Sequence, residues 1–354
     1  MKKFDVDTPA LLLDLDVVER NIVSMAAFFA KRKQKLRPHF KTPKTPEIAR
    51  RQLAAGAIGI TASKLGEVEV LTRAGLGPIL LANQIAGVQK IKRLLALDSN
   101  IEVIVTVESE FNVRELEEAA RQSRRRLPVI IEVDVGMHRC GTATPAETVN
   151  LARLISRGPL NYRGIMGYEG HAVLVRDKTE REQRAREAMS KLSQHVAALS
   201  ANGLEPGIVS AGGTGTYDIA GNWAEVTEVQ AGSYVFMDGA YQAVRPDLGQ
   251  PALSLLTTVI ARHGDYAIID AGMKSLTNEF GPPEGKELPV KVSRLSEEHG
   301  HLTVAQGARI LPGMKLEVIP SHGDTTINLH SEYYVVRGDE VVTIWSIEAA
   351  RAYR

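Results

Sequence analysis

Short apolar runs alternate with longer amphipathic segments over the first two thirds of the chain. The apolar runs predict strands at 36–40, 58–62, 78–82, 101–107, 128–134, 162–168, 207–211 and 226–231. Helical apolar spacing, with glycines where helices commonly end, predicts helices at 17–30, 45–55, 64–75, 86–97, 109–124, 144–158 and 179–202. Eight strands that alternate with helices favour an α/β fold, a closed (β/α)8 barrel of the TIM type, over an open sheet.

The pattern changes after about residue 245, where short strand-like runs follow one another with little helix between them. These runs predict strands at 253–262, 266–271, 290–295, 302–305, 315–319, 325–329, 333–336 and 341–347. An extended apolar run at 8–14 precedes the barrel and is expected to join them. We therefore predict a barrel domain over 15–244 and a C-terminal β-rich domain made of 1–14 and 245–354.

Size and composition narrow the class of protein. The 354 residues are 44% hydrophobic, which is enough for a large core. Lysine and arginine total 43 against 42 for aspartate and glutamate, so charge gives no basis for binding nucleic acid or a membrane surface. A single cysteine excludes an internal disulfide, and no segment has the length of a signal peptide or a membrane span. These features predict a cytoplasmic protein.

A basic stretch from Arg37 to Lys44 surrounds a lysine that can carry chemistry. The strand predicted at 36–40 ends directly before Lys41, and the chemistry of parallel barrels lies at the carboxyl ends of the strands. Desolvation and neighbouring cations lower the pKa of a lysine, and a neutral amine can form a Schiff base. A solvated basic loop is the alternative interpretation of the same residues.

Two further polar segments follow predicted barrel strands. Arg139 lies in a glycine turn after the fifth strand, where a guanidinium can bind a planar anion; a surface arginine is the alternative. Tyr168 and His171 follow the sixth strand, where an imidazole that titrates near neutral pH can act as a general base. A structural histidine is the alternative there.

Glycine-rich segments follow the last two predicted strands. The first contains Gly212, Gly213 and Thr214, and the second contains Gly232, Ser233 and Tyr234. Glycines let backbone amides approach an anion, and barrels often bind phosphate with the loops after strands seven and eight. The two segments are candidates for a phosphate-binding cup, although ordinary turns have the same composition.

A candidate metal site lies in the β-rich region. His322 and Asp324 are two residues apart, so on an extended backbone both side chains project from one face. One imidazole and one carboxylate suit Mn²⁺, Mg²⁺ or Zn²⁺. The alternative is a turn capped by the aspartate.

Several of these segments together resemble one enzyme family. The motif Arg-Pro-His-x-Lys-Thr-x-Lys at 37–44 is similar to the cofactor-lysine motif of the D-threonine aldolase and D-serine dehydratase family. Its members are pyridoxal 5′-phosphate (PLP) enzymes of the alanine-racemase-like fold, known as fold type III. The segments His-Arg-Cys-Gly, Tyr-Glu-Gly-His, Gly-Gly-Thr and Ala-Gly-Ser-Tyr also resemble family motifs, so the resemblance covers most of the chain. Gly323 and Thr325 depart from it, because cysteine and proline are frequent at these positions.

The resemblance implies roles for the candidate residues. Lys41 would hold PLP as a Schiff base, with His39, Arg139 and Tyr168 beside the cofactor. The glycine segments would bind the phosphate through Gly212, Gly213, Thr214, Gly232, Ser233 and Tyr234. His322 and Asp324 would bind the activating divalent metal, with Mn²⁺ expected and Mg²⁺ or Zn²⁺ as alternatives. His171 would be the base that acts on the substrate hydroxyl, as in the aldolase branch.

The implied activity is cleavage of D-threonine and related D-β-hydroxy amino acids into glycine and an aldehyde, by a carbon–carbon lyase. A D-serine or 3-hydroxy-D-aspartate dehydratase, or a 3-hydroxy-D-aspartate aldolase, is the first alternative. A non-catalytic PLP carrier on the same barrel is another. The resemblance also implies a homodimer that binds a small D-amino acid, with neither nucleic acid nor a membrane as a partner.

Overall fold

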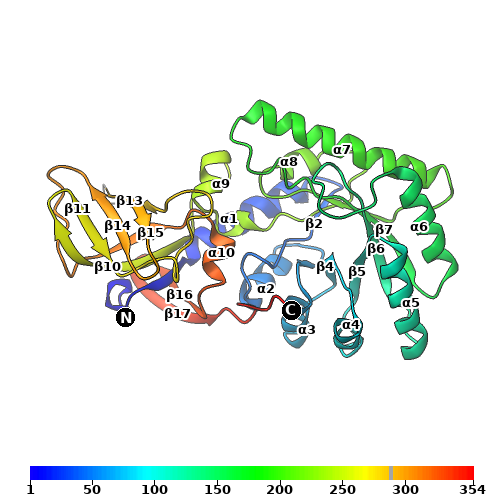
Figure 1. Cartoon of the computed structure of the whole chain (residues 1–354), viewed down its shortest axis with the longest axis horizontal. Helices are drawn as coiled ribbons and strands as arrows, with labels where there is room; N and C mark the ends of the chain where they lie inside the picture. The colour runs from blue at the N-terminus through cyan, green and yellow to red at the C-terminus, as the bar shows by residue number, and fades with distance from the viewer. Residues whose placement is uncertain (287–289) are drawn as a thin grey trace. The chain divides into compact units, whose positions relative to one another are not determined.

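The computed structural model spans residues 1–354 and describes all of them except 287–289. The chain forms two compact units (Figure 1). Residues 25–41, 48–232 and 352–354 form the first, here called the barrel unit. Residues 1–24, 42–47 and 233–351 form the second, here called the β unit. No helix in the described part of the chain is long and apolar enough to cross a bilayer.

A parallel sheet of eight strands is the framework of the barrel unit. Its strands are β2 (Lys35–Leu36), β3 (Ile60–Ala62), β4 (Ile79–Gln84), β5 (Val103–Val107), β6 (Pro128–Glu132), β7 (Asn161–Met166), β8 (Ile208–Ala211) and β9 (Glu228–Val229). They run in the order β2-β9-β8-β7-β6-β5-β4-β3, and a parallel bridge between His39 and Thr61 joins the two ends. The predicted barrel of eight parallel strands is confirmed.

Helices lie outside this sheet and alternate with its strands (Figure 1). They are α2 (Pro46–Ala54), α3 (Leu65–Arg73), α4 (Val88–Leu95), α5 (Glu110–Ser123), α6 (Pro145–Arg157), α7 (Lys178–Ser200) and α8 (Tyr217–Ala220), preceded in the chain by α1 (Leu15–Ala30). The first six, like α1, are confirmed to within two residues of their predicted bounds. Local signals begin several of them; at α6, Thr144 and Glu147 form a reciprocal capping box.

Side chains fill the inside of the barrel, as in other barrels of this type. Leu80, Ile104, Ile130 and Met166, from four successive strands, form one cluster in which each is at most 2% exposed. A filled interior leaves no passage through the barrel, so ligands must bind at the strand ends. The segments that follow the strands therefore decide the chemistry.

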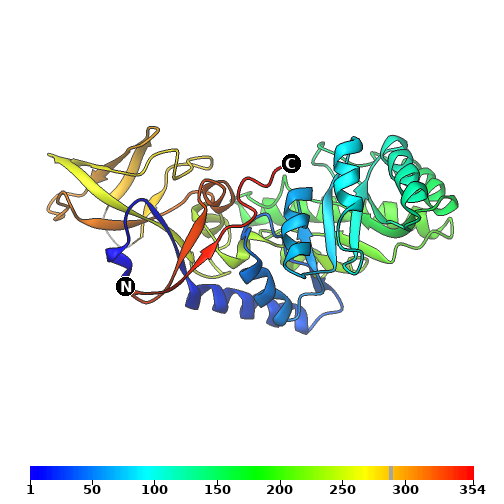
Figure 2. The ribbon, with the colours of Figure 1, turned by 90° about the horizontal axis from the view of Figure 1, so that it is seen from below.

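An antiparallel sheet forms most of the β unit. Its strands are β1 (Ala10–Asp14), β10 (Leu253–His263), β11 (Tyr266–Ile269), β12 (Glu284–Gly285), β13 (Val290–Leu295), β14 (Gly300–Val304), β15 (Lys315–Ile319), β16 (Glu332–Arg337) and β17 (Glu340–Ser346). Pairing of β10 with β11 closes six of these strands into a small barrel, and β1, β16 and β17 extend the sheet from β10 (Figure 2). The predicted β-rich region is confirmed, including the N-terminal strand, which lies between β10 and β16.

The strand predicted at 325–329 is wrong, because residues 325–327 belong to helix α10 (Gly323–Ile327) and residues 328–329 to the turn that follows it. Threonine and isoleucine favour strands, but tertiary contacts override that preference here. The Asp238 carboxylate accepts a hydrogen bond from Gly323 N at 2.8 Å, and Thr326 Oγ1 accepts one from Thr277 N at 3.2 Å. These two bonds hold a helical turn in place of an extended segment.

Candidate functional site

Lys41 follows the segment that closes the barrel. The backbone N–H groups of Lys35, Arg37 and His39 donate to carbonyls of Thr227, Val229 and Ala231, at 2.9, 2.9 and 3.2 Å. Because every second residue from 35 to 39 donates to the segment 227–231, the β2–β9 pairing continues beyond the two residues of β2. Lys41 lies just after the carboxyl end of this paired segment. Its N–H donates to His39 Nδ1 at 3.3 Å, which ties the lysine backbone to the imidazole predicted beside it.

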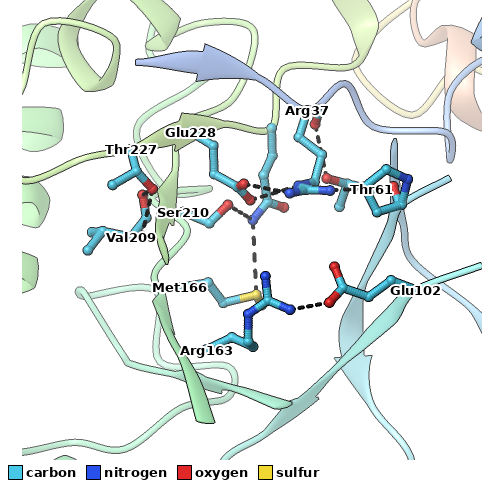
Figure 3. Close-up of polar contacts among 11 residues, drawn as sticks. Arg37, Thr61, Glu102, Arg163, Met166, Val209, Ser210, Thr227 and Glu228 are labelled. Atoms are coloured by element: carbon cyan, nitrogen blue, oxygen red, sulfur yellow. Dashed lines mark hydrogen bonds and ion pairs between the residues drawn. The ribbon is translucent and has the colours of Figure 1, made fainter. Parts of the chain in front are cut away.

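A buried ion pair fixes the start of this segment (Figure 3). Arg37 Nε and Nη2 donate to the two carboxylate oxygens of Glu228, at 2.9 and 2.8 Å, and both side chains are at most 5% exposed. Two parallel hydrogen bonds from one guanidinium to one carboxylate fix the orientation of both side chains. On the other side, Thr61 Oγ1 donates to Arg37 O at 3.0 Å. The segment before Lys41 is therefore held to both neighbouring strands.

The predicted phosphate loop, residues 212–216, connects β8 to α8 and is here called the glycine loop. Gly212 has a φ of +82°, a conformation that side chains rarely adopt. A Cβ on Gly213 would lie 3.1 Å from Tyr168 Cε2, so the tyrosine ring packs directly on the loop backbone. The structure thus brings together Gly212, Gly213 and Tyr168, and Thr214, the next residue of the loop, is buried.

A buried carboxylate that the sequence interpretation missed supports the glycine loop. Glu169 is 0% exposed and accepts hydrogen bonds from Gly212 N at 3.2 Å and Thr216 Oγ1 at 2.6 Å. Thr216 Oγ1 in turn accepts one from Gly213 N at 3.3 Å. Burial raises the pKa of Glu169, against the opposing effect of its hydrogen bonds. An acidic residue three positions after the end of β7, close to the predicted His171, was the signal for this role.

His171 follows the glutamate in a loop next to cationic side chains. A Cβ on Gly136 would lie 3.4 Å from His171 Cε1 and 3.1 Å from Lys191 Nζ, so the imidazole and the ammonium flank the same glycine. His171 Nδ1 is buried and has no hydrogen-bond partner among the described residues. Burial, with the charges of Arg184 and Lys191, lowers the pKa of His171, which keeps the imidazole neutral and able to accept a proton.

Arg139 lies near Tyr168 and a buried acidic residue. Its guanidinium carbon is 5.8 Å from the centre of the Tyr168 ring, and its Nη2 is 3.8 Å from Glu132 Oε1. The Glu132 side chain is only 6% exposed, and Gln84 Nε2 donates to its other oxygen at 2.5 Å. Burial raises the pKa of Glu132, and the Arg139 charge partly offsets this. The guanidinium stays half exposed and can bind an anion.

Of the other predicted residues, Gly232 is the last residue of the segment 48–232 of the barrel unit, and the rest belong to the β unit. Ser233 and Tyr234 are buried in the short helix η2 (Ser233–Val235), where Ser233 Oγ lies 3.4 Å from Thr42 Oγ1, and Gly232 directly precedes them. His322 is extended, with φ −139° and ψ 122°, whereas Asp324 lies in the first turn of α10. The extended backbone expected through both residues is therefore wrong, although they remain two residues apart on one tight turn.

Neighbouring carboxylates surround this turn. His322 Nδ1 lies 2.7 Å from Glu279 Oε2, and Asp238, which is 1% exposed, binds Gly323 N between the two predicted metal ligands. Burial raises the pKa of Asp238 to about 6. The described residues contain no group of three or more His, Cys, Asp or Glu side chains arranged to hold a metal. His322 and Asp324 offer one nitrogen and one carboxylate, which fits a divalent ion that takes its other ligands from water or substrate.

The barrel and its residues define a class of protein: an enzyme of PLP fold type III, with a lysine after the first strand and a glycine loop after the seventh. Residues 13–240 match the alanine racemase N-terminal domain family, and residues 252–336 match the putative serine dehydratase domain family. The chain belongs to this family of PLP-dependent enzymes, in the group that contains D-threonine aldolases and D-serine dehydratases.

Individual relatives are similar over nearly their whole length. The chain is 36% identical to a D-threonine aldolase of an Arthrobacter species, over 97% of this chain and 93% of the relative. It is 33% identical to a 3-hydroxy-D-aspartate aldolase of Paracoccus denitrificans (strain Pd 1222), over 99% and 93%. The crystal structure of D-threonine aldolase from Filomicrobium marinum superposes with a TM-score of 0.97 at 35% identity, covering 100% of this chain and 98% of that one.

Proposed function

We propose that this enzyme is a metal-activated aldolase that cleaves D-threonine, and related D-β-hydroxy amino acids, to glycine and an aldehyde. The observation that carries the proposal is the TM-score of 0.97 to a D-threonine aldolase, over the full chain. The chain is also 36% identical to a D-threonine aldolase and 33% identical to a 3-hydroxy-D-aspartate aldolase. A neutral histidine after β7 supplies the base that this cleavage needs.

The barrel unit has the features that PLP binding requires. Lys41 is the proposed amine for the Schiff base, and the glycine loop, together with the segment at Gly232–Tyr234, is the proposed phosphate-binding element. Gly213 is closely packed, because a Cβ there would lie 3.0 Å from Val173 Cγ1 and 3.1 Å from Tyr168 Cε2, so a larger residue would have to displace these side chains. Arg139 remains available for a carboxylate or a ring oxygen. PLP, once bound, acts as an electron sink for the carbanion formed at Cα.

His322 and Asp324 are the proposed ligands of a divalent metal, and Mn²⁺ suits their nitrogen and oxygen donors. Such an ion would lower the pKa of a β-hydroxyl. His171 is the proposed general base that takes the proton from that hydroxyl. Its lowered pKa keeps it unprotonated at neutral pH, as a base must be before the carbon–carbon bond breaks.

Two alternatives have support of their own. The 33% identity to a 3-hydroxy-D-aspartate aldolase favours the same reaction on a substrate with a second carboxylate. The match of residues 252–336 to the putative serine dehydratase domain favours loss of the hydroxyl, which needs a base at Cα and an acid at the leaving oxygen. A PLP carrier without activity would need Lys41 and the glycine loop but not the metal pair. The homodimer and the cytoplasmic location also remain proposals.

Product analysis separates these functions. Purified enzyme with Mn²⁺ is incubated separately with D-threonine and 3-hydroxy-D-aspartate, with L-threonine as the control for configuration. We expect acetaldehyde and glycine from D-threonine and no reaction with L-threonine. Chelation should abolish turnover while the PLP absorbance is retained. Formation of 2-oxobutanoate and ammonia from D-threonine, or full activity after exhaustive chelation, would overturn it.

A further inference from the structure

A carboxylate outside the predicted site contacts the predicted metal-binding histidine. Glu279 Oε2 lies 2.7 Å from His322 Nδ1. The same oxygen accepts a hydrogen bond from Thr325 Oγ1 at 3.1 Å. The His322 ring also packs against Phe280, with 4.7 Å between ring centres. Glu279 therefore holds one edge of the imidazole and Phe280 packs on one of its faces, and together they set its orientation.

The backbone around Glu279 is tied to the turn that carries His322 and Asp324. Thr277 N donates to Thr326 Oγ1 at 3.2 Å, and Ser321 Oγ donates to Thr277 O at 3.3 Å. From another direction, Asp238 binds Gly323 N at 2.8 Å and Tyr241 N at 2.9 Å. All of these residues belong to the β unit. Glu279 thus lies on a loop that is fixed to the metal-binding turn.

Resting on the proposed metal site, we infer that Glu279 is a positioning residue for His322. A neutral imidazole has one N–H and one lone pair, and the hydrogen bond at one nitrogen decides which nitrogen binds a metal. With Glu279 accepting from Nδ1–H, the Nε2 lone pair is the one presented to the ion. The negative charge of Glu279 also makes the imidazole a more basic ligand. Partners of this kind typically change metal affinity by about 10–100-fold when removed.

Substitution of Glu279 distinguishes this role from direct ligation. Oε2 of Glu279 lies within hydrogen-bond distance of both His322 Nδ1 and Thr325 Oγ1. Glutamine at this position keeps an oxygen that can accept from Nδ1–H but loses the charge, whereas alanine loses both. Glu279→Gln should therefore retain much of the metal affinity, in contrast to the substitution of a true ligand.

The test measures Mn²⁺ binding to the PLP-loaded enzyme by the electron paramagnetic resonance signal of free Mn²⁺, after prior chelation. We expect the Kd for Mn²⁺ to rise about 10–100-fold in Glu279→Ala and by less than about tenfold in Glu279→Gln. His322→Ala should abolish binding. Glu298→Ala is the matched control, because Glu298 is 60% exposed and pairs with Lys274, and its Kd should equal the wild-type value. Thermal unfolding checks that each variant is folded.

The possible results distinguish the positioning role of Glu279 from the existence of the metal site itself. Wild-type affinity in Glu279→Ala, together with loss of binding in His322→Ala, would overturn the role of Glu279 and leave the metal site in place. Equal losses in Glu279→Gln and Glu279→Ala would show direct ligation and would also overturn it. Wild-type affinity in His322→Ala would instead refute the metal site itself.

Discussion

Replacement of Glu169 tests whether one buried carboxylate holds the glycine loop. Glu169→Ala removes the acceptor for two buried donors, Gly212 N–H and the Thr216 hydroxyl. Each buried donor left without a partner costs about 1–3 kcal/mol, and the Thr216 hydroxyl can rotate toward another acceptor. We therefore expect the free energy of unfolding to fall by about 2–4 kcal/mol.

The same loss should weaken cofactor binding. If the phosphate must supply about 1.5–3 kcal/mol to order the loop, PLP binds about 10–100-fold more weakly. Glu169→Gln keeps the shape and one acceptor oxygen, and its amide can donate to the Thr216 oxygen. We expect the free energy of unfolding of this variant to lie within about 1 kcal/mol of the wild-type value, and its affinity for PLP to be close to that of the wild type.

The pH dependence follows from the sign of the pKa shift. Burial raises the pKa of Glu169 above its unfolded value, so its stabilising contribution is complete below the unfolded pKa and is lost as pH rises through the folded pKa. Glutamine does not titrate. The stability of Glu169→Gln relative to wild type should therefore increase from acid toward neutral pH.

The measurements are urea unfolding across that pH range and titration of apoenzyme with PLP, followed by absorbance. Glu118→Ala is the control on the barrel unit, because its side chain is 61% exposed and surface ion pairs contribute little. If the free energy of unfolding of Glu169→Ala is within about 0.5 kcal/mol of the wild-type value and the PLP affinity is unchanged, Glu169 does not stabilise the glycine loop.

Further predictions concern the two proposed catalytic residues. Borohydride reduction followed by peptide mapping should place PLP on Lys41, and an adduct on Lys44 with Lys41 unmodified would contradict the assignment. His171→Asn should lower kcat for D-threonine cleavage about 10²–10⁴-fold while PLP remains bound; a wild-type rate would exclude His171 as the base. Because the Lys191 charge lowers the pKa of His171, Lys191→Met should move the acid limb of the pH–rate profile to higher pH, and an unchanged limb would show that another group titrates.

Local patterns in the sequence were sufficient to predict the barrel. Most of its strands carry apolar residues on both faces because side chains fill the interior and helices cover the outside, so most of them read as short apolar runs. Lys41, Arg139 and His171 are candidate site residues because each follows such a run, and strand ends in parallel barrels are where polar groups can gather. These features depend on residues close together in the chain.

The supporting carboxylates were missed because their partners are distant in sequence. Glu169 and Gly212 are 43 residues apart, as are Glu279 and His322, and nothing local predicts either contact. Before folding, each glutamate is an ordinary charged residue. Only burial beside specific donors makes Glu169 a brace for the glycine loop.

The segment after Pro320 is a case in which the local sequence pattern predicts the wrong secondary structure. Its β-branched residues predict a strand, yet hydrogen bonds from Gly323 to Asp238 and from Thr277 to Thr326 make it helix α10. The sequence by itself determined the barrel strands and pointed to Lys41 and the His322–Asp324 pair as candidates, because these are properties of neighbouring residues. The tertiary structure alone decided the conformation of that pair and the carboxylates around it, because long-range hydrogen bonds outweigh local propensity where the backbone is buried.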